Sequence, residues 1–274
     1  MRKYQIIVWC LILSSFPVYT LALEYIGGDG RAASLGFTQI ATNESCNFLG
    51  NPATIGRKKL DLIFSSSELY GIGIFNNNMA LGVNLTPHIR LGLGFEELVD
   101  KDDIDNSGYG QRLLNFGVAF ALKPQWRVGL NFHADRFFLE TENIGSGQGV
   151  TLGLHSGPWH LGQTDLNAGF VVKDIAFAKR SYTTDTDEVP PITFEYGLNA
   201  KRGSFLFQGD LVDENIRMGV EYEISSGLDL RAGLIDKQPT FGFGVKLGCL
   251  QVDYSYWLSP IGSATHRISN RISF

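Results

Sequence analysis

Hydrophobic and polar positions alternate along the chain almost to its last residue. Phe241, Phe243 and Val245, for example, alternate with Gly242 and Gly244. Because successive side chains of a β-strand point to opposite faces, each such row lies on one side of a sheet. No stretch beyond residue 22 shows a convincing helical period. The pattern therefore predicts an all-β protein.

The alternating rows divide into about 14 predicted strands. A further apolar stretch, residues 60–64, is either one more strand or part of a plug, so about 12 to 16 strands fit the pattern. The predicted strands are residues 68–75, 79–86, 88–97, 110–123, 125–140, 148–156, 159–173, 191–201, 203–212, 215–225, 227–236, 238–247, 249–258 and 265–274.

Every second connection between these strands is tight, and the long segments lie in the connections between them. The long segments are residues 97–110, 140–147, 174–190 and 258–265. Short turns at one end and long loops at the other are typical of bacterial outer-membrane barrels, whose short turns face the periplasm. With an even strand count, we expect both termini on the periplasmic side. The tight connections are Pro87, Pro124-Gln125, Gly157-Pro158, Arg202, Ser226 and Gly248.

A soluble β-sandwich also shows alternation, but it buries its apolar rows between two sheets and needs a polar exterior. An outer-membrane barrel turns its apolar rows toward lipid and its polar or small residues toward the lumen. Here the apolar rows are long and aromatic, and the opposite rows mix glycine with isolated charges. We therefore interpret the chain as a single transmembrane antiparallel β-barrel.

Isolated charges on the glycine-containing rows are predicted to line the lumen. An Arg or Lys that faces hydrocarbon at the membrane midplane costs about 2–4 kcal/mol, so the lumen is the favourable place for it. These charges form either a cross-barrel ion-pair network or a selectivity filter. They are Arg127, Asp135, Glu195, Lys201, Asp210, Arg217, Glu221, Glu223, Arg231, Lys246 and Asp253.

Composition narrows the class of protein further. The chain of 274 residues is 44% hydrophobic, 12% aromatic and only 19% charged, with 32 glycines. Intrinsic disorder requires low hydrophobicity with high net charge, and is excluded. The 23 Lys and Arg residues against 28 Asp and Glu residues leave a net charge of -5, so no basic surface for nucleic acid is expected.

The first residues have the pattern of a secretory signal. Arg2 and Lys3 are basic, residues 6–13 are apolar, and residues 20–22 form a small-residue cleavage site. We therefore divide the chain into a signal peptide (1–22), an N-terminal hatch or plug segment (23–59) and an outer-membrane barrel (60–274).

Two motifs resemble those of a known family. Residues 30–36 (GRAASLG) and the motif Asn51-Pro52-Ala53 resemble the N-terminal segment of FadL/PorV-like outer-membrane proteins. Residues 265–269 (THRIS) and the terminal Phe274 look like the last strand of that group and like the signal read by the outer-membrane assembly machinery. The group includes long-chain fatty acid transporters and the PorV and PorQ proteins of type IX secretion. The resemblance implies an N-terminal hatch inside the barrel.

Two functions follow from the resemblance. One is passage of small, apolar molecules controlled by the hatch around Asn51, and the other is a scaffold that receives secreted protein cargo without a conducting lumen. A barrel lipid hydrolase is a third, less favoured reading, because His155 and Ser156 point to opposite faces of a strand and cannot form a nucleophile–base pair. We expect no enzymatic activity, no cofactor and no metal ion.

Two smaller features complete the prediction. Cys46 in the hatch and Cys249 in a short turn could form a disulfide that fastens the hatch to the barrel, since the periplasm is oxidising. Asp103, Asp105 and Ser107 resemble the first half of a calcium loop. Leu114, however, stands where that loop would need a chelating glutamate.

Overall fold

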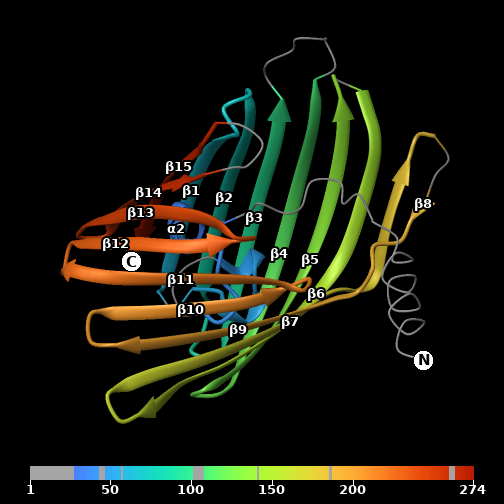
Figure 1. The fold of residues 1–274 in the computed structure, drawn as a ribbon. Coiled ribbons are helices and arrows are strands. Elements are labelled where there is room, and N and C mark those ends of the chain that lie inside the picture. Colours follow the sequence, from blue (N-terminus) through green and yellow to red (C-terminus); the bar gives the residue numbers. More distant parts are fainter. Residues whose placement is uncertain are drawn as a thin grey trace, which may run out of the picture.

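A single antiparallel sheet closes into a barrel in the computed structural model (Figure 1). The first strand, β1 (Leu60–Leu69), pairs with the last, β15 (Thr265–Ser273), and β6 (Glu142–Leu161) pairs with β7 (Thr164–Tyr182). Fourteen strands form the ring, so the predicted all-β barrel is confirmed. The structure describes residues 28–42, 47–56, 58–100, 108–140, 142–184, 187–258 and 263–274.

The other strands follow one another around the ring in the order of the chain. A two-residue strand, β8 (Asp187–Glu188), lies outside the ring and pairs with the outer part of β7. The other ring strands are β2 (Ile74–Asn84), β3 (Ile89–Asp100), β4 (Tyr109–Lys123), β5 (Trp126–Leu139), β9 (Thr193–Arg202), β10 (Phe205–Val212), β11 (Asn215–Ser225), β12 (Leu228–Ile235), β13 (Gln238–Leu247) and β14 (Leu250–Trp257).

The first two strands lie earlier in the chain than predicted. Residues 60–64 belong to β1, and the turn between β1 and β2 falls within residues 70–73. The prediction of strands at 68–75 and 79–86 was wrong, because the glycines of this turn extend the alternating row. Gly71 and Gly73 have positive φ angles of 63° and 77°, which let the chain reverse where the sequence pattern continues.

A second error concerns Gly157-Pro158, which does not form a turn. These residues lie within β6, which continues to Leu161 before the chain reverses at Gly162. The register of β6 against β7 shifts between Ser156 and Trp159. Such a bulge accommodates a proline, which has no N–H to give to the sheet.

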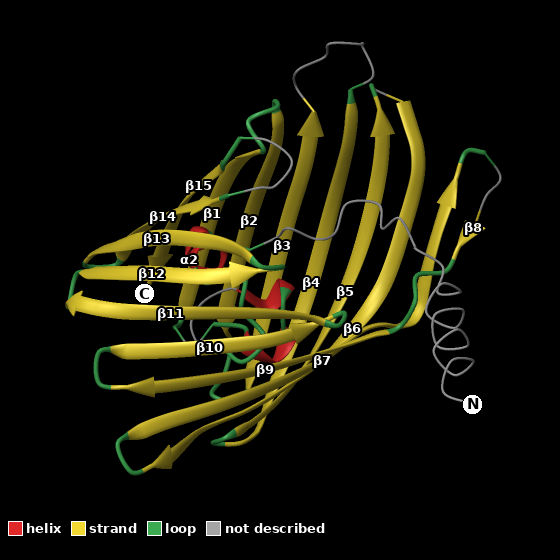
Figure 2. Ribbon diagram, in the orientation of Figure 1, coloured by secondary structure: helices red, strands yellow, loops and turns green. Residues whose placement is uncertain are grey.

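Two of the predicted long segments are mostly strand. β6 begins at Glu142, and β7 continues to Tyr182. As a result, the strands differ greatly in length (Figure 2). β4 to β7, here called the tall wall, have 15, 14, 20 and 19 residues. β10 to β15, the short wall, have 8 to 11. About 9–11 residues suffice to cross a bilayer, so the tall wall is longer than the membrane requires.

Strand β9 illustrates how the barrel directs its side chains. Phe194, Tyr196 and Leu198 are 50–69% exposed, whereas Glu195 and Asn199 between them are 1% and 7% exposed. The same arrangement recurs around the ring, with apolar side chains outside and polar or charged ones inside. A soluble protein would bury the aromatic rows, so this surface is that of a transmembrane barrel. Within the described ranges, no helix is long and apolar enough to cross a bilayer.

Residues 28–42 and 47–56 lie inside the barrel and are here called the N-terminal segment. They include helix α2 (Gly30–Ser34) and the short 3-10 helices η1 (Asn47–Leu49) and η2 (Pro52–Thr54). The helices lie within the ring of strands (Figure 2). α2 contacts β12 to β15, and η2 contacts β4 to β6.

Apolar contacts help to hold the N-terminal segment. Phe48 and Ile55 pack with apolar side chains of β1, β2 and β4, and Phe37 packs against Trp257 of β14. The ring centroids of Phe37 and Trp257 are 5.7 Å apart. The buried core of this protein therefore lies between the segment and the inner wall, whereas a soluble sandwich would have its core between two sheets.

Candidate functional site: the N-terminal segment and the cavity beside it

Helix α2 begins with a charged contact to the last strand. Asp29 caps the helix by accepting a hydrogen bond from the Ala32 backbone N–H at 2.8 Å. Its second carboxylate oxygen is 2.5 Å from Nη2 of Arg271 in β15. Both residues are almost fully buried. This pair fixes the start of α2 against the short wall.

A larger ion-pair network continues from α2 into the short wall. Arg31 donates two hydrogen bonds to Glu221 of β11, with distances of 2.9 and 3.1 Å. Arg231 of β12 also donates to Glu221 at 2.6 Å. The remaining guanidinium nitrogens of Arg231 lie 2.6 Å from Asp253 and 3.2 Å from Asp229.

Burial makes this network sensitive to the loss of one member. Asp229 and Asp253 are each 1% exposed, and Arg231 is 4% exposed. Removing one charge from such a cluster leaves its partners desolvated and uncompensated. The geometry favours the interpretation of these charges as a network that holds the N-terminal segment.

The chain that follows α2 is held by a carboxylate. The backbone N–H groups of Gln39 and Ile40 both donate to Oδ2 of Asp210 in β10, at 2.6 and 3.0 Å. Gly169 of β7 lies next to Ile40: a Cβ on Gly169 would be 2.0 Å from the Ile40 carbonyl oxygen. Only glycine allows the backbone of the segment to approach the wall so closely.

The Asn51-Pro52-Ala53 motif forms the start of η2. The amide nitrogen of Asn51 donates to the carbonyl oxygens of Ile40 at 2.7 Å and Leu154 at 3.0 Å. Its amide oxygen accepts from the Ala53 N–H at 3.0 Å. Asn51 therefore caps η2 and at the same time joins it to strand β6 and to the preceding part of the segment.

Glycines in the tall wall make room for η2. A Cβ on Gly129 of β5 would lie 2.3 Å from the carbonyl carbon of Pro52, and one on Gly153 of β6 would lie 2.2 Å from Oδ1 of Asn51. Real Cβ contacts of this length do not occur. Several glycines of the alternating rows are thus explained by the segment that packs on them.

The structure places the predicted lumen charges in different surroundings. Arg127 and Glu195 are buried, with Arg127 2.8 Å from Nδ1 of His155 and Glu195 2.5 Å from Nζ of Lys173. Arg217 and Asp135 are buried as well. Glu223 is half-buried, Lys246 is half-buried and 2.9 Å from Asp229, and Lys201 is exposed. The first two pairs and the α2 network are separate clusters.

Several residues of the site were missed by sequence reasoning. Arg267 is 1% exposed and donates to the Gly28 carbonyl oxygen, to Ser67 and to Asn76. Arg267 and Arg271 alternate with Ile268 and Ile272, so the same pattern could have assigned them to the lumen. Asp29 and Arg31 lie on a segment without alternation, and no sequence signal indicated their partners.

The proposed disulfide and calcium loop are not tested by these contacts. Cys249 is an exposed free thiol, and Cys46 lies outside the described residues. Asp103, Asp105 and Ser107 also lie outside them. Among the residues that the structure does describe, no group of three or more His, Cys, Asp or Glu side chains could hold a metal ion.

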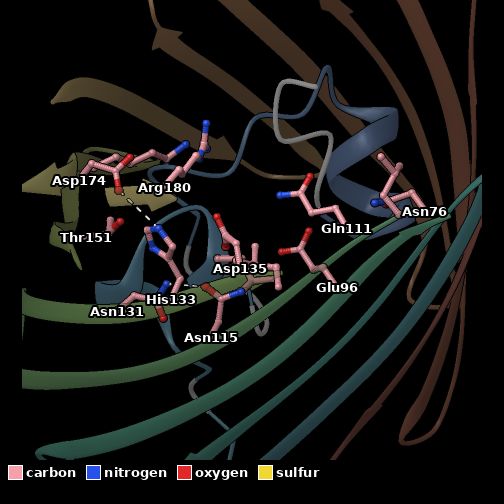
Figure 3. Close-up of a pocket in the computed structure, with 14 residues that line it drawn as sticks. Asn76, Glu96, Gln111, Asn115, Asn131, His133, Asp135, Thr151, Asp174 and Arg180 are labelled. Atoms are coloured by element: carbon pink, nitrogen blue, oxygen red, sulfur yellow. Dashed lines mark hydrogen bonds and ion pairs between the residues drawn. The ribbon is translucent and has the colours of Figure 1, made fainter. Parts of the chain in front are cut away.

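A cavity of about 170 Å³ lies beside η1, against the inner face of the tall wall (Figure 3). Eleven of its 14 lining residues are polar or charged. The lining includes three carboxylates, two cationic side chains, one histidine, four amides and three leucines. The lining residues are Leu49, Asn76, Glu96, Leu98, Gln111, Leu113, Asn115, Asn131, His133, Asp135, Thr151, Lys173, Asp174 and Arg180.

An irregular stretch of β7 brings Lys173, Asp174 and Arg180 to the cavity. Asp174 and Phe177 have positive φ angles of 56° and 57°, and the register against β6 shifts around Val150. Nε2 of His133 then lies 3.4 Å from Asp174. Residues 174–190 are predicted to be a loop, so the prediction places neither Asp174 nor Arg180 in the lumen.

Charged side chains of β7 and β8 form ion pairs near the end of β7. Nζ of Lys179 is 2.9 Å from Asp187, and Nη1 of Arg180 is 3.9 Å from Glu188. Hydrogen bonds from Lys179 and Ser181 hold the pKa of Asp187 below its ordinary value. Lys179, Asp187 and Glu188 are solvent-exposed and Arg180 is half-buried, so each of these pairs contributes little to stability.

Comparisons with known proteins identify the fold. No family model and no curated protein matches the sequence. Among solved structures, CymD, a monoaromatic hydrocarbon channel, is 13% identical with a TM-score of 0.67 over 92% of this chain and 99% of CymD. The toluene transporter TbuX of Ralstonia pickettii is 13% identical with a TM-score of 0.58 over 90% and 98% of the two chains.

A FadL homologue of Pseudomonas aeruginosa has the same architecture. It is 9% identical to this chain, with a TM-score of 0.58 over 90% of this chain and 98% of the homologue. At such low identities the similarity concerns the fold alone. The fold is that of FadL-like barrels, as the resemblance in sequence implies. By their names, these similar structures are a channel, a transporter and a FadL homologue. Nothing in them bears on PorV, PorQ or type IX secretion.

Proposed function

We propose that this protein is an outer-membrane barrel that transports small molecules, with the N-terminal segment as its hatch. The observation that supports it is the placement of the segment, which contacts both walls of the barrel and adjoins a cavity of about 170 Å³. A purely structural barrel would need no such cavity. The names of the similar structures, a hydrocarbon channel and a toluene transporter, point to the same class of activity.

The two ends of the segment differ in how they would move. α2 is joined to the short wall by buried ion pairs. Their separation would leave buried charges without partners in the lumen. η2 is joined to the tall wall by neutral hydrogen bonds and close packing. We propose that η2, together with η1, moves to open a path, while α2 remains in place.

Two engineered disulfides test this function. A Cβ on Gly94 of β3 would lie 2.8 Å from Cδ2 of Leu49, and one on Gly30 would lie 3.0 Å from Oγ of Ser269. These contacts mark the two places where a cysteine pair would lie between the segment and the wall, and formation of each disulfide, which needs Cβ atoms about 3.5–4.5 Å apart, is checked first. The Leu49→Cys/Gly94→Cys and Gly30→Cys/Ser269→Cys pairs are made in a background with Cys46→Ser and Cys249→Ser.

The measurement is uptake of small solutes into liposomes that contain the purified protein. We expect the oxidised Leu49–Gly94 disulfide to block uptake and its reduction to restore it, because this disulfide ties η1 to the wall. The Gly30–Ser269 disulfide should leave uptake unchanged, since it fixes a part of the segment that does not move. Uptake that persists with the first disulfide formed contradicts the hatch, and a protein without any uptake contradicts transport.

The scaffold for secreted protein cargo is the second function expected from the sequence. No contact among the described residues favours it over transport. The same liposomes separate the two functions, because a scaffold barrel admits no solute in either redox state and co-purifies with exported proteins. Outer-membrane insertion with both termini toward the periplasm is part of the proposal. Protease access to tags at the two ends of the mature chain would test that orientation.

A further inference from the structure

We propose that the cavity binds a small molecule that combines a cationic amine with a ring-sized apolar part. This inference rests on the proposed transport function and names the class of its substrate. It differs from the hydrocarbons in the names of the similar structures, because the lining of this cavity presents buried polar atoms that a hydrocarbon could not satisfy.

The volume of the cavity indicates the size of the part of a ligand that it can hold. A dry engineered cavity of about 150 Å³ holds one benzene molecule. The cavity here has about 170 Å³, so it accommodates roughly one six-membered ring with a short substituent. Leu49, Leu98 and Leu113 supply an apolar part of the lining for such a ring.

Three buried polar atoms define where the substituent binds. Oδ1 of Asp135, Oδ1 of Asn131 and Nδ2 of Asn115 have no hydrogen-bond partner among the described residues. Asp135 is 5% exposed, and the two asparagines are 4% exposed. The other amide atoms of Asn131 and Asn115 are joined to each other at 2.7 Å. Two of the three atoms are acceptors, so they favour a ligand that donates hydrogen bonds.

The charge balance favours a positive ligand. Glu96, Asp135 and Asp174 bring three carboxylates to the lining, against the cations Lys173 and Arg180 and the imidazole of His133 beside Asp174. Lys173 lies 2.5 Å from Glu195, which is not part of the lining, so its charge is compensated outside the cavity. An ammonium group would therefore be attracted to the cavity and a carboxylate repelled.

Asp135 is the residue best placed to receive the ammonium group. In Figure 3, Asp135 lies between the His133–Asp174 pair and Glu96. His133 already has Asp174 as its neighbour at 3.4 Å. A charge-assisted hydrogen bond from an ammonium group would satisfy the buried Oδ1 of Asp135 that lacks a partner.

Four probes of similar size but different chemistry test the proposal. The probes are benzylamine, benzyl alcohol, benzoate and toluene, and isothermal titration measures their binding to the purified full-length protein in detergent. We expect benzylamine to bind about tenfold more tightly than the alcohol, and benzoate and toluene to bind more weakly still. Toluene or benzoate binding as tightly as benzylamine would overturn the proposal, as would the absence of benzylamine binding.

Two variants of the cavity and one matched control locate the site. Asp135→Asn and Glu96→Gln remove a carboxylate charge inside the cavity with little change of shape. Glu97→Gln removes a carboxylate charge from the outer face of β3, the strand that also carries Glu96. There Glu97 contacts Arg112. We expect about tenfold weaker benzylamine binding for Asp135→Asn, weaker binding for Glu96→Gln, and wild-type binding for Glu97→Gln.

Folding and function are controlled separately. Heat-dependent mobility on a gel shows whether each variant barrel is folded, and if Asp135→Asn is not, Glu96→Gln decides the question. Unchanged benzylamine affinity in the folded cavity variants refutes the site. Benzylamine binding without uptake into liposomes leaves the site intact and refutes transport, whereas uptake of toluene without benzylamine binding refutes the ligand class alone.

Discussion

The two ends of the N-terminal segment are held by different kinds of interaction. At α2, Arg31 and Asp29 form ion pairs with charged side chains of the short wall. At η2, Asn51 donates to a backbone carbonyl of the tall wall, and Gly129 and Gly153 let the chain lie directly against the strands. One end depends on charge and the other on shape.

The difference supports the proposal that one end of the enclosed segment stays attached while the other end moves. Buried ion pairs resist separation, because each partner is left without solvent or counter-charge. A neutral, close-packed contact loses less when it separates, since amides and carbonyl oxygens can find water as partners. The following predictions test this contrast, beginning with the largest expected effect.

Replacing Arg231 should give the largest loss of stability. Arg231→Met removes the contacts to Glu221, Asp229 and Asp253, and leaves Asp253 without its arginine partner. We expect the free energy of unfolding to fall by about 3–5 kcal/mol, the range for breaking a buried ion pair. Urea unfolding in lipid vesicles measures it. Arg231→Lys keeps the charge but not all the contacts, so its free energy of unfolding should lie between those of the wild type and Arg231→Met. A loss below about 1 kcal/mol would contradict the role of charge at α2.

A methyl group on Gly129 should affect the shape-dependent end. Gly129→Ala places a Cβ 2.3 Å from the carbonyl carbon of Pro52, so η2 must shift. We expect a destabilisation of about 1–3 kcal/mol, as for overpacked cores, together with easier opening of the hatch and faster solute uptake. Gly209→Ala is the matched control, because its Cβ would find its nearest atom at 3.9 Å. Equal effects of the two substitutions would show that η2 does not rest on the wall.

Asn51 should give a smaller effect at the same end. Asn51→Ala removes the hydrogen bonds to Ile40 and Leu154 and the cap of η2, which should cost about 1–2 kcal/mol. Asn51→Asp should cost more than Asn51→Ala, because a carboxylate would face two carbonyl oxygens. Urea unfolding ranks the two variants, and the reverse order would mean that Asn51 does not donate to these carbonyl groups.

The smallest effect is expected for an ion pair on the outside of the barrel. Nε of Arg112 lies 2.9 Å from Glu97, as close as Arg31 to Glu221, but the Arg112 side chain is 55% exposed. Arg112→Met should change the free energy of unfolding by no more than about 0.5 kcal/mol. A loss comparable to that of Arg231→Met would show that burial is not what distinguishes the α2 network.

Much of the fold could be predicted because alternation reports which face of a strand meets lipid. In β9, the row of Phe194, Tyr196 and Leu198 was assigned to the outside by its period alone, and the structure has it there. Strand ends were harder to predict. A glycine can continue an alternating row or reverse the chain. The sequence pattern alone therefore does not distinguish the turn at Gly71 from the bulge at Gly157.

The candidate site was predictable only in part. Arg231, Glu221 and Asp253 could be assigned to the lumen because they lie on alternating strands. Their joint contact with α2 could not, since Arg31 and Glu221 are 190 residues apart in sequence. The cavity was not foreseen either, because the irregular part of β7 that carries Asp174 and Arg180 resembles a loop in the sequence.

The amino-acid sequence by itself determined the class of this protein: strands with apolar outer rows and a polar interior, closed into a ring. It could do so because the period of two and the high cost of charge in lipid act locally, residue by residue. Only the tertiary structure decided which charges meet, which glycines carry the N-terminal segment and where the polar cavity lies. Those features depend on distances across the lumen, and such distances exist only after the ring has closed.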